Sequence, residues 1–276
     1  MKLAMSNIAW LPDEADECLG LLQEAGAKGL EIAPGLTFPQ EADPFNPSPA
    51  AVSALFASLE AYGLQLVSMQ SLLFGVQNAR LFGTPAERDT FEAGLQRAIG
   101  LAGLLGIPNL VMGSPGNRAI PEGMDRKEAE AEARALFRRL GDKAEAAGTR
   151  LALEPNPAAY GTNFLTTLSE AVDFAVYVDH PAITVNFDIG ALHMNEEFDQ
   201  GAQLFDYGRN IVSHVHMSEP NLAPAPKDPA ALGKLASHIL NTGYSGWFSI
   251  EMRQAGVAEV KSALARAASS LRSAAA

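Results

Sequence analysis

The chain has 276 residues, of which 47% are hydrophobic and 19% charged, so it carries enough apolar sequence for a large core. Its formal net charge of −12 argues against general nucleic-acid binding, because a phosphate backbone would be repelled. Cys18 is the single cysteine, which excludes a disulfide framework and a cysteine-rich zinc site. The first ten residues lack the apolar run of a signal peptide, and no stretch is long and apolar enough to cross a membrane. We therefore expect a cytoplasmic protein without a nucleic-acid or membrane partner.

The elements expected along the chain alternate between helix and strand. Five times an amphipathic stretch is followed by a glycine and then by a short apolar run, which is typical of a helix that ends before a buried strand. These glycines are Gly26, Gly63, Gly106, Gly148 and Gly243. Three further strands are expected without this signal, in KLAMSNIAW, ITVNFD and IVSHVHMS. The eight strands would start near residues 3, 28, 64, 109, 150, 183, 211 and 246.

The segments between the strands are expected to be helices. The clearest covers residues 125–147, where alanines and leucines recur at spacings of three and four and Asp125 stands at the N-cap position. A last helix is expected over residues 257–271. Eight alternating units predict a parallel sheet with right-handed crossovers, closed into a single (β/α)8 TIM barrel over residues 1–276. The alternative is an open doubly wound sheet, but the glycine-rich turn that usually follows its first strand is missing here.

Four consecutive predicted strands end in an acid or an imidazole. Strand five ends in LALEPN with Glu154, and strand six ends in VNFDIG with Asp188. Strand seven ends in SHVHMS with His216, and strand eight ends in FSIEM with Glu251. Each residue alone would more often be an ion-pair partner or a structural residue, but in a barrel these strand ends meet at one face. Together they predict one divalent cation; Mn²⁺ or Mg²⁺ suits mostly oxygen ligands, and Co²⁺ or Zn²⁺ stays open.

Further candidates for the pocket come from the same strand ends and loops. The substrate-binding candidates are His193, His214, Trp10, Asn156 and Gln70. His214 points to the same face as His216, because strand side chains alternate with a period of two, but it lies one layer deeper and can equally support a ligand or belong to the core. Trp10 can equally pack in the core, and Gln70 can equally belong to the scaffold. Glu31 at the end of strand two and Arg118 in a later loop have similarly open roles.

At the metal-site segments the chain resembles a known family. LALEPN, VNFDIGALHMNEE, SHVHMSEPN and GYSGWFSIEM look like those of the xylose-isomerase-like TIM-barrel superfamily. The pattern is most similar to its sugar isomerase/epimerase group, which includes D-tagatose 3-epimerase, D-psicose 3-epimerase and hydroxypyruvate isomerase. The resemblance implies that Glu154, Asp188, His216 and Glu251 bind one divalent metal, which a keto sugar or similar substrate chelates through a carbonyl and an adjacent hydroxyl. It also implies that Glu154 and Glu251 move a proton through a cis-enediolate.

The residues around the substrate depart from that pattern. In ketohexose epimerases an Arg follows the metal-binding His by six positions, and a Glu follows the strand-five ligand by six. This chain has Leu222 and Tyr160 at those two positions. The substrate-binding His of those enzymes follows the strand-six Asp by three positions, whereas His193 follows Asp188 by five. These departures argue against a free ketohexose as the substrate.

The leading hypothesis is therefore a metal-dependent isomerase or epimerase acting on a small carbohydrate. The alternative is a metal-dependent lyase on the same scaffold, of the inosose dehydratase or the C-glycoside and 3-oxo-glycoside cleaving type, because an enediolate can expel a β leaving group. A DNA-repair endonuclease would need more metal ligands, and a purely structural metal would have its ligands saturated by protein groups. The apolar stretch over residues 71–83 predicts a lid or a contact between copies in a homo-oligomer.

Overall fold

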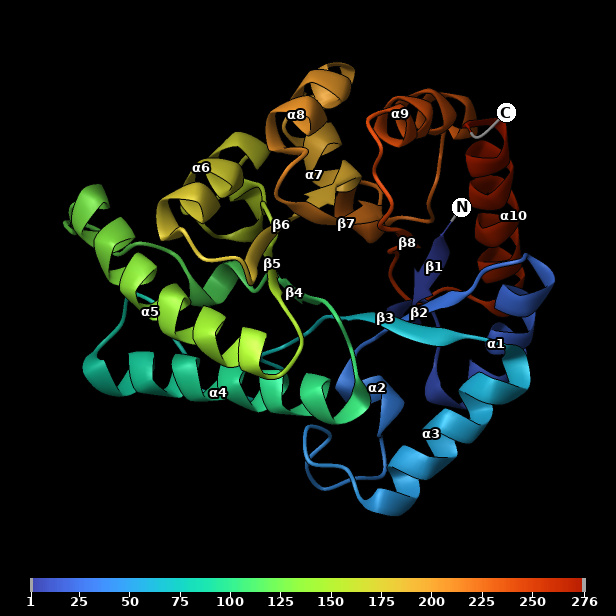
Figure 1. Cartoon of the computed structure of the whole chain (residues 1–276), viewed down its shortest axis with the longest axis horizontal. Coiled ribbons are helices and arrows are strands. Elements are labelled where there is room, and N and C mark those ends of the chain that lie inside the picture. The colour runs from blue at the N-terminus through green and yellow to red at the C-terminus, as the bar shows by residue number, and fades with distance from the viewer. Residues whose placement is uncertain (1, 275–276) are drawn as a thin grey trace.

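The computed structural model describes residues 2–274, in which eight parallel strands form a closed barrel surrounded by helices (Figure 1). The strands are β1 (Leu3–Ser6), β2 (Gly29–Ile32), β3 (Gln65–Met69), β4 (Leu110–Met112), β5 (Leu151–Leu153), β6 (Ile183–Asp188), β7 (Val212–Met217) and β8 (Trp247–Ile250). They pair in chain order, and β8 pairs with β1 to close the barrel. The predicted (β/α)8 fold is confirmed, and each strand starts within one residue of its expected position.

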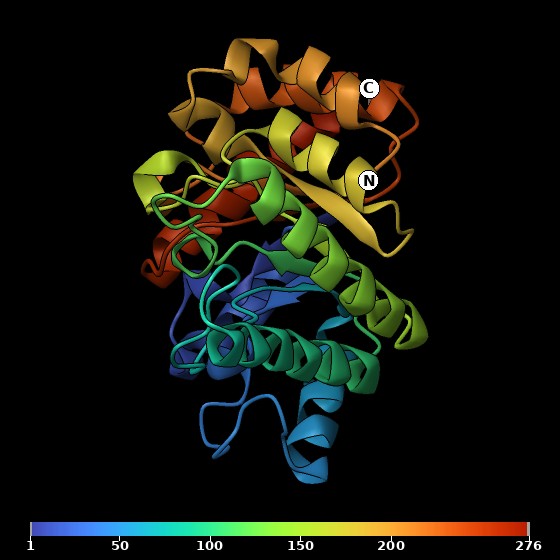
Figure 2. The same ribbon diagram turned by 90° about the vertical axis from the view of Figure 1, so that its left-hand side faces the viewer.

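The helices form an outer layer around the strands. The connecting helices are α1 (Ala15–Glu24), α3 (Pro49–Tyr62), α4 (Pro85–Leu105), α5 (Arg126–Ala146), α6 (Leu168–Val178), α8 (Gly201–Gly208), α9 (Pro229–Asn241) and α10 (Val257–Ala274). Figures 1 and 2 show this layer from two sides, and α10 packs against α1, so the last helix meets the first. Two short helices, α2 (Pro34–Thr37) and α7 (Ile189–Met194), follow the carboxyl ends of β2 and β6. They therefore belong to the barrel face on which the site is built.

Local residues set the helix ends. α5 begins after Asp125, whose carboxylate accepts hydrogen bonds from the backbone N–H groups of Lys127 and Glu128 at 2.9 and 3.1 Å. α3 and α4 end at Gly63 and Gly106, whose φ angles of 62° and 67° lie in the left-handed region that favours glycine. At these points the chain turns back towards the barrel and enters the next strand.

One continuous apolar core fills the barrel and the layer between strands and helices. The segment over residues 71–83 contributes Leu72, Leu73, Leu81 and Phe82 to this core, while Phe74 is 57% exposed. Packing within the chain therefore explains most of the apolar character of this segment. None of the described helices combines the length and the apolar character that crossing a bilayer requires.

Candidate metal centre

Four side chains meet at the carboxyl ends of neighbouring strands. Glu154 directly follows β5, Asp188 ends β6, His216 lies in β7 and Glu251 directly follows β8. Each offers a ligand atom, and these atoms all lie within 4.8 Å of one another. The strand register explains why they converge: Asp188 and Ser249 both pair with His216, and Glu251 follows Ser249 by two residues on the same face. The structure thus brings together the four residues that the sequence singled out.

The imidazole of His216 lies at the centre of this cluster. Its Nδ1 is 3.1 Å from Oε1 of Glu154, 3.2 Å from Oε2 of Glu251 and 3.7 Å from Oδ2 of Asp188. Within the described residues, this fully buried nitrogen has no hydrogen-bond partner of acceptable geometry. A buried nitrogen without a partner that faces three carboxylates is the arrangement expected where a cation binds. The donor set of one imidazole and three carboxylates fits a divalent ion such as Mn²⁺ or Mg²⁺.

The electrostatics of the cluster favour a positive charge at its centre. Burial raises the pKa of Glu251 to about 7, despite the attraction of His216. Burial acts in the same direction on Glu154, but the neighbouring His216 and a hydrogen bond from Asn156 hold its pKa below the usual value. Burial would lower the pKa of His216, yet Glu251 and Glu31 outweigh it and hold that pKa well above the usual value. A cation bound by these carboxylates would compensate the same buried negative charge that a proton on His216 compensates.

Glu154 is fixed by neighbours from several segments. Its Oε1 accepts a hydrogen bond from Nδ2 of Asn186 at 2.9 Å, and its Oε2 accepts one from Nδ2 of Asn156 at 3.1 Å. At Gly113 the backbone approaches so closely that a Cβ would lie 2.5 Å from Oε2 of Glu154. Arg118 is only 1% exposed, and its Nη2 donates to the carbonyl oxygen of Glu154 at 2.6 Å and to Oδ1 of Asn156 at 2.8 Å. Arg118 is thus a buried support of this part of the site.

Asp188 is oriented by the segments that follow β6 and β7. Its Oδ1 accepts a hydrogen bond from the backbone N–H of Ala191, so Asp188 caps α7. Its Oδ2 accepts a hydrogen bond from Oγ of Ser218 at 2.8 Å, and Oγ itself accepts one from the N–H of Gly190 at 2.8 Å. The helix N-terminus and the serine together fix which oxygen of Asp188 faces the cluster.

A cavity of about 430 Å³ opens onto the cluster, within the size range of sites for small molecules. Its walls include Glu154, Asp188, Glu251, Asn156, Tyr160, Asn221 and Leu222. A second cavity of about 260 Å³ also borders Glu154, and Gln70, Ser71 and Ser114 line it. Neither lining, in the part of the chain that the structure describes, includes a Lys or an Arg. The space next to the cluster is therefore acidic where it borders the four side chains, and the described residues that line it carry no positive charge.

The structure separates the five substrate-binding candidates. Asn156 lines the larger cavity beside Glu154, and Gln70 lines the smaller one. His214 is buried one layer deeper in the barrel. His193 lies on α7 and lines a different cavity, and Trp10 is buried and lines yet another. Of the five, Asn156 and Gln70 share the wall of one of these cavities with Glu154.

Sequence reasoning missed two residues that support the cluster. Asn186 precedes Asp188 by two positions on β6, and Ser218 follows His216 by two just after β7. Since side chains two apart on a strand share a face, the spacing alone could have indicated both. Arg118 comes from a loop after β4, and no spacing to a ligand could indicate its buried contacts.

Comparison with known proteins agrees with this fold. Residues 19–274 match the Xylose isomerase-like TIM barrel family, and the chain belongs to this family. The resemblance drawn from the metal-site segments is thereby confirmed at the family level. No curated protein matches the sequence.

Solved structures with the same fold include sugar epimerases. L-ribulose 3-epimerase is similar with a TM-score of 0.80 and 16% identity, covering 100% of this chain and 96% of that one. The 3-keto-D-glucoside 4-epimerase from E. coli has a TM-score of 0.77 and 18% identity, with 96% and 98% covered. An AP endonuclease, family 2, from Brucella melitensis has a TM-score of 0.73 and 22% identity, with 96% and 97% covered. At such identities the likeness shows the shared fold.

Proposed function

We propose that the protein is a divalent-metal-dependent isomerase or epimerase that acts on a keto sugar or a sugar-like substrate. One observation carries the proposal: Nδ1 of His216, which has no hydrogen-bond partner among residues 2–274, faces three carboxylates beside a cavity of small-molecule size. Membership of the family and the presence of sugar epimerases among proteins of the same fold support it.

Glu154, Asp188, His216 and Glu251 would hold the cation, with Mn²⁺ or Mg²⁺ expected from the oxygen-rich donor set. When bound, such a cation polarises a substrate carbonyl as a Lewis acid and stabilises negative charge on the enediolate oxygens. Four protein ligands leave room for substrate oxygens around an ion that prefers six. The residues of the chain then have to orient the substrate and move one proton.

We assign the proton transfer to Glu154 and Glu251. They come from β5 and β8, which β6 and β7 separate in the barrel, so they reach the cavity from different sides. One carboxylate accepts the proton as the C–H bond breaks, and the bonding electrons pass into the enediolate. The other returns a proton to carbon, and return to the opposite face inverts a stereocentre. Asn186 and Asn156 keep Glu154 from rotating away during this exchange.

The substrate in this proposal carries neither a phosphate nor a carboxylate group. Both cavities beside Glu154 lack a lining Lys or Arg among the described residues, and four acids line the larger one. An anionic group there would be repelled, whereas neutral hydroxyls find partners in Asn156, Asn221 and the phenol of Tyr160.

The lyase alternative has support from one wall of the cavity. Leu222 and Tyr160 line it at the positions where ketohexose epimerases carry Arg and Glu, and Pro155 and Pro157 lie beside them. This apolar wall suits an aglycone better than a sugar hydroxyl. A 3-oxo-glycoside could then lose its aglycone from the carbon β to the carbonyl, after the same proton abstraction.

Metal analysis followed by incubation in D₂O with keto sugars, inososes and 3-oxo-glycosides tests both versions. An isomerase or epimerase returns a sugar of the same formula with one deuterium on carbon, whereas a lyase releases water or an aglycone. We expect Glu251→Gln to lower the exchange rate by at least about 100-fold with the fold intact. Glu122→Gln, which changes an exposed glutamate in a loop, is the matched control. Wild-type exchange in Glu251→Gln would contradict the assignment of this proton-transfer group.

A further inference from the structure

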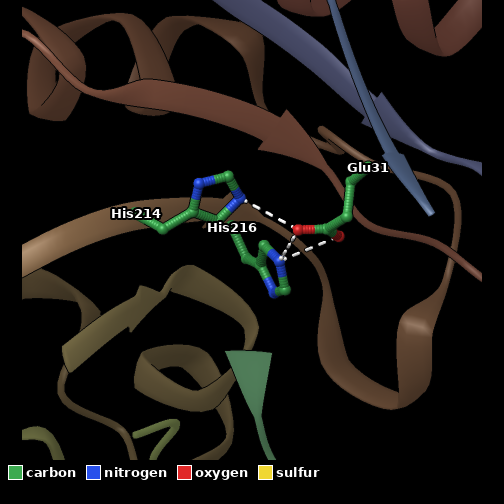
Figure 3. A group of neighbouring side chains, drawn as sticks. All are labelled: Glu31, His214 and His216. Atoms are coloured by element: carbon green, nitrogen blue, oxygen red, sulfur yellow. Dashed lines mark hydrogen bonds and ion pairs between the residues drawn. The ribbon is translucent and has the colours of Figure 1, made fainter. Parts of the chain in front are cut away.

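Glu31, His214 and His216 form a second group of buried side chains (Figure 3). In this group, Glu31 lies on the Nε2 side of the His216 ring. Glu31 is the third residue of β2, and His214 and His216 lie two residues apart on β7. All three are at most 1% exposed. A carboxylate buried this completely is costly unless its oxygens are hydrogen-bonded, so its contacts indicate what keeps it there.

Among the described residues, the polar contacts of Glu31 are with side chains that can donate to it. Nε2 of His216 lies within hydrogen-bond distance of both carboxylate oxygens of Glu31, at 3.1 Å from each. Nε2 of His214 lies 3.0 Å from Oε2, an ion-pair distance without hydrogen-bond geometry among the described residues. Nε2 of Gln70 donates to Oε1 at 2.8 Å and to Oγ of Ser6 on β1 at 2.7 Å. The register between β2 and β3 shifts immediately before Glu31, an irregularity of the kind that re-aims a side chain. Side chains of β7 and of the residue that follows β3 therefore surround this carboxylate of β2 and hold it against His216.

The two ring nitrogens of His216 face different surroundings. Nε2 faces the carboxylate of Glu31. Nδ1 faces Glu154, Asp188 and Glu251 and has no hydrogen bond within the part of the chain that the structure describes. A neutral imidazole has one N–H and one lone pair, and a carboxylate can only accept. Once a cation is held by the three carboxylates, the contact with Glu31 places the N–H on Nε2 and leaves the lone pair on Nδ1 directed at that cation.

We propose that Glu31 is a positioning residue that fixes the tautomer and the orientation of His216, so that His216 binds the cation through Nδ1. Gln70 serves this role indirectly, because its hydrogen bond to Oε1 keeps the Glu31 carboxylate from rotating, and the His214 ring packs beside Oε2. The inference rests on the proposed function, since it requires a cation in the cluster.

The variant Glu31→Gln tests this role with little change of shape. Gln70 donates to Oε1, so the amide of the variant has to keep its oxygen there and place its NH₂ near Nε2 of His214 and His216. That NH₂ and the N–H of His216 are both donors, so they face each other without an acceptor between them. The variant also lacks the negative charge of the Glu31 carboxylate next to Nε2. Removing such a carboxylate behind a metal-binding histidine typically weakens metal binding by about 10- to 100-fold.

The experiment is calorimetric titration of metal-free protein with Mn²⁺ alone. We expect one Mn²⁺ per chain for the wild type, and a Kd about 10- to 100-fold higher at the same stoichiometry for Glu31→Gln. The matched control is Asp206→Asn, which removes an exposed carboxylate 3.0 Å from Nε2 of His238, and its Kd should equal that of the wild type.

The outcomes separate this inference from the proposed function. Equal Kd values for the wild type and Glu31→Gln would overturn the role of Glu31 and leave the metal site intact. Two Mn²⁺ per wild-type chain and one in the variant would also overturn it, because Glu31 would then be a ligand itself. A wild type that binds no divalent ion would contradict the proposed function instead.

A second measurement covers the case in which Glu31→Gln does not fold. Wild-type protein labelled with ¹⁵N in its histidines and loaded with Zn²⁺, a diamagnetic ion, reports the state of each ring nitrogen by NMR. We expect a proton on Nε2 of His216 and the shift of a metal-bound nitrogen at Nδ1. Zinc bound at Nε2, or a proton at Nδ1, would overturn the proposal.

Discussion

Gly113 offers a way to move one carboxylate of the candidate site while leaving the fold almost unchanged. It directly follows β4, and a Cβ at this position would lie 2.5 Å from Oε2 of Glu154 and 3.4 Å from Oδ1 of Asn156. Restoring ordinary van der Waals contact in Gly113→Ala requires Oε2 of Glu154 to retreat by roughly 0.5–1 Å. A displacement of about 1 Å in a reacting or positioning group can cost on the order of 100-fold in rate.

Stability should change much less than activity. The φ of Gly113 is not in the left-handed region, and the atom that must move is the end of a side chain. We expect the free energy of unfolding of Gly113→Ala to stay within about 1 kcal/mol of the wild type, because the alanine also restricts the unfolded chain. The rate of deuterium uptake into substrate should fall about 100-fold.

The assay pairs urea unfolding with deuterium exchange in the same preparations. Gly116→Ala is the matched control, because a Cβ at Gly116 in the same loop would meet no atom within 4 Å. If Gly113→Ala exchanged deuterium at the wild-type rate, the position of Glu154 would not matter for the reaction, and the argument for its role would fail.

Three further predictions concern the cation, the barrel and a helix end. Mn²⁺ affinity should fall as pH drops through about 7, because Glu251 and His216 have raised pKa values and their protons then compete with the ion. A Kd for Mn²⁺ that does not change between pH 6 and 8 would contradict this. Gly29→Ala would place a Cβ 2.9 Å from the ring of Trp247 and should destabilise the fold by about 1–3 kcal/mol in urea unfolding. Asp125→Ala removes the N-cap of α5 and should lower the free energy of unfolding by about 1 kcal/mol in the same assay. An unchanged free energy of unfolding would mean that this cap does not stabilise the fold.

The order of elements was available from the sequence because it depends on local patterns. Glycines such as Gly63 and Gly106 mark helix ends through a backbone conformation that few other residues adopt easily, and the apolar runs after them mark buried strands. Asp125 at the start of α5 is a signal of the same local kind. Closure into a barrel followed from counting eight such units, since each strand and helix packs against its neighbours in the same way.

The four candidate ligands were also available, because the barrel places the last residue of every strand on one face. Residues on other strands and loops could not be placed in this way. Glu31 looked like any acid at a strand end, and Arg118 like a loop residue in solvent, yet both are buried against the site. Trp10 and His193 were candidates for the pocket, but Trp10 lies beyond the end of β1 and His193 lies on α7, and each lines another cavity.

By itself, the sequence determined the succession of strands and helices and the acids and imidazole at four strand ends, because periodicity and chain order are local properties. Only the tertiary structure decided which side chains contact those candidate ligands and hold them in place. The contact of Glu31 with His216 joins residues 185 positions apart, and that of Arg118 with Asn156 joins residues 38 apart. Such contacts depend on the register of strands around the closed barrel and on the path of a loop, which no spacing along the chain encodes.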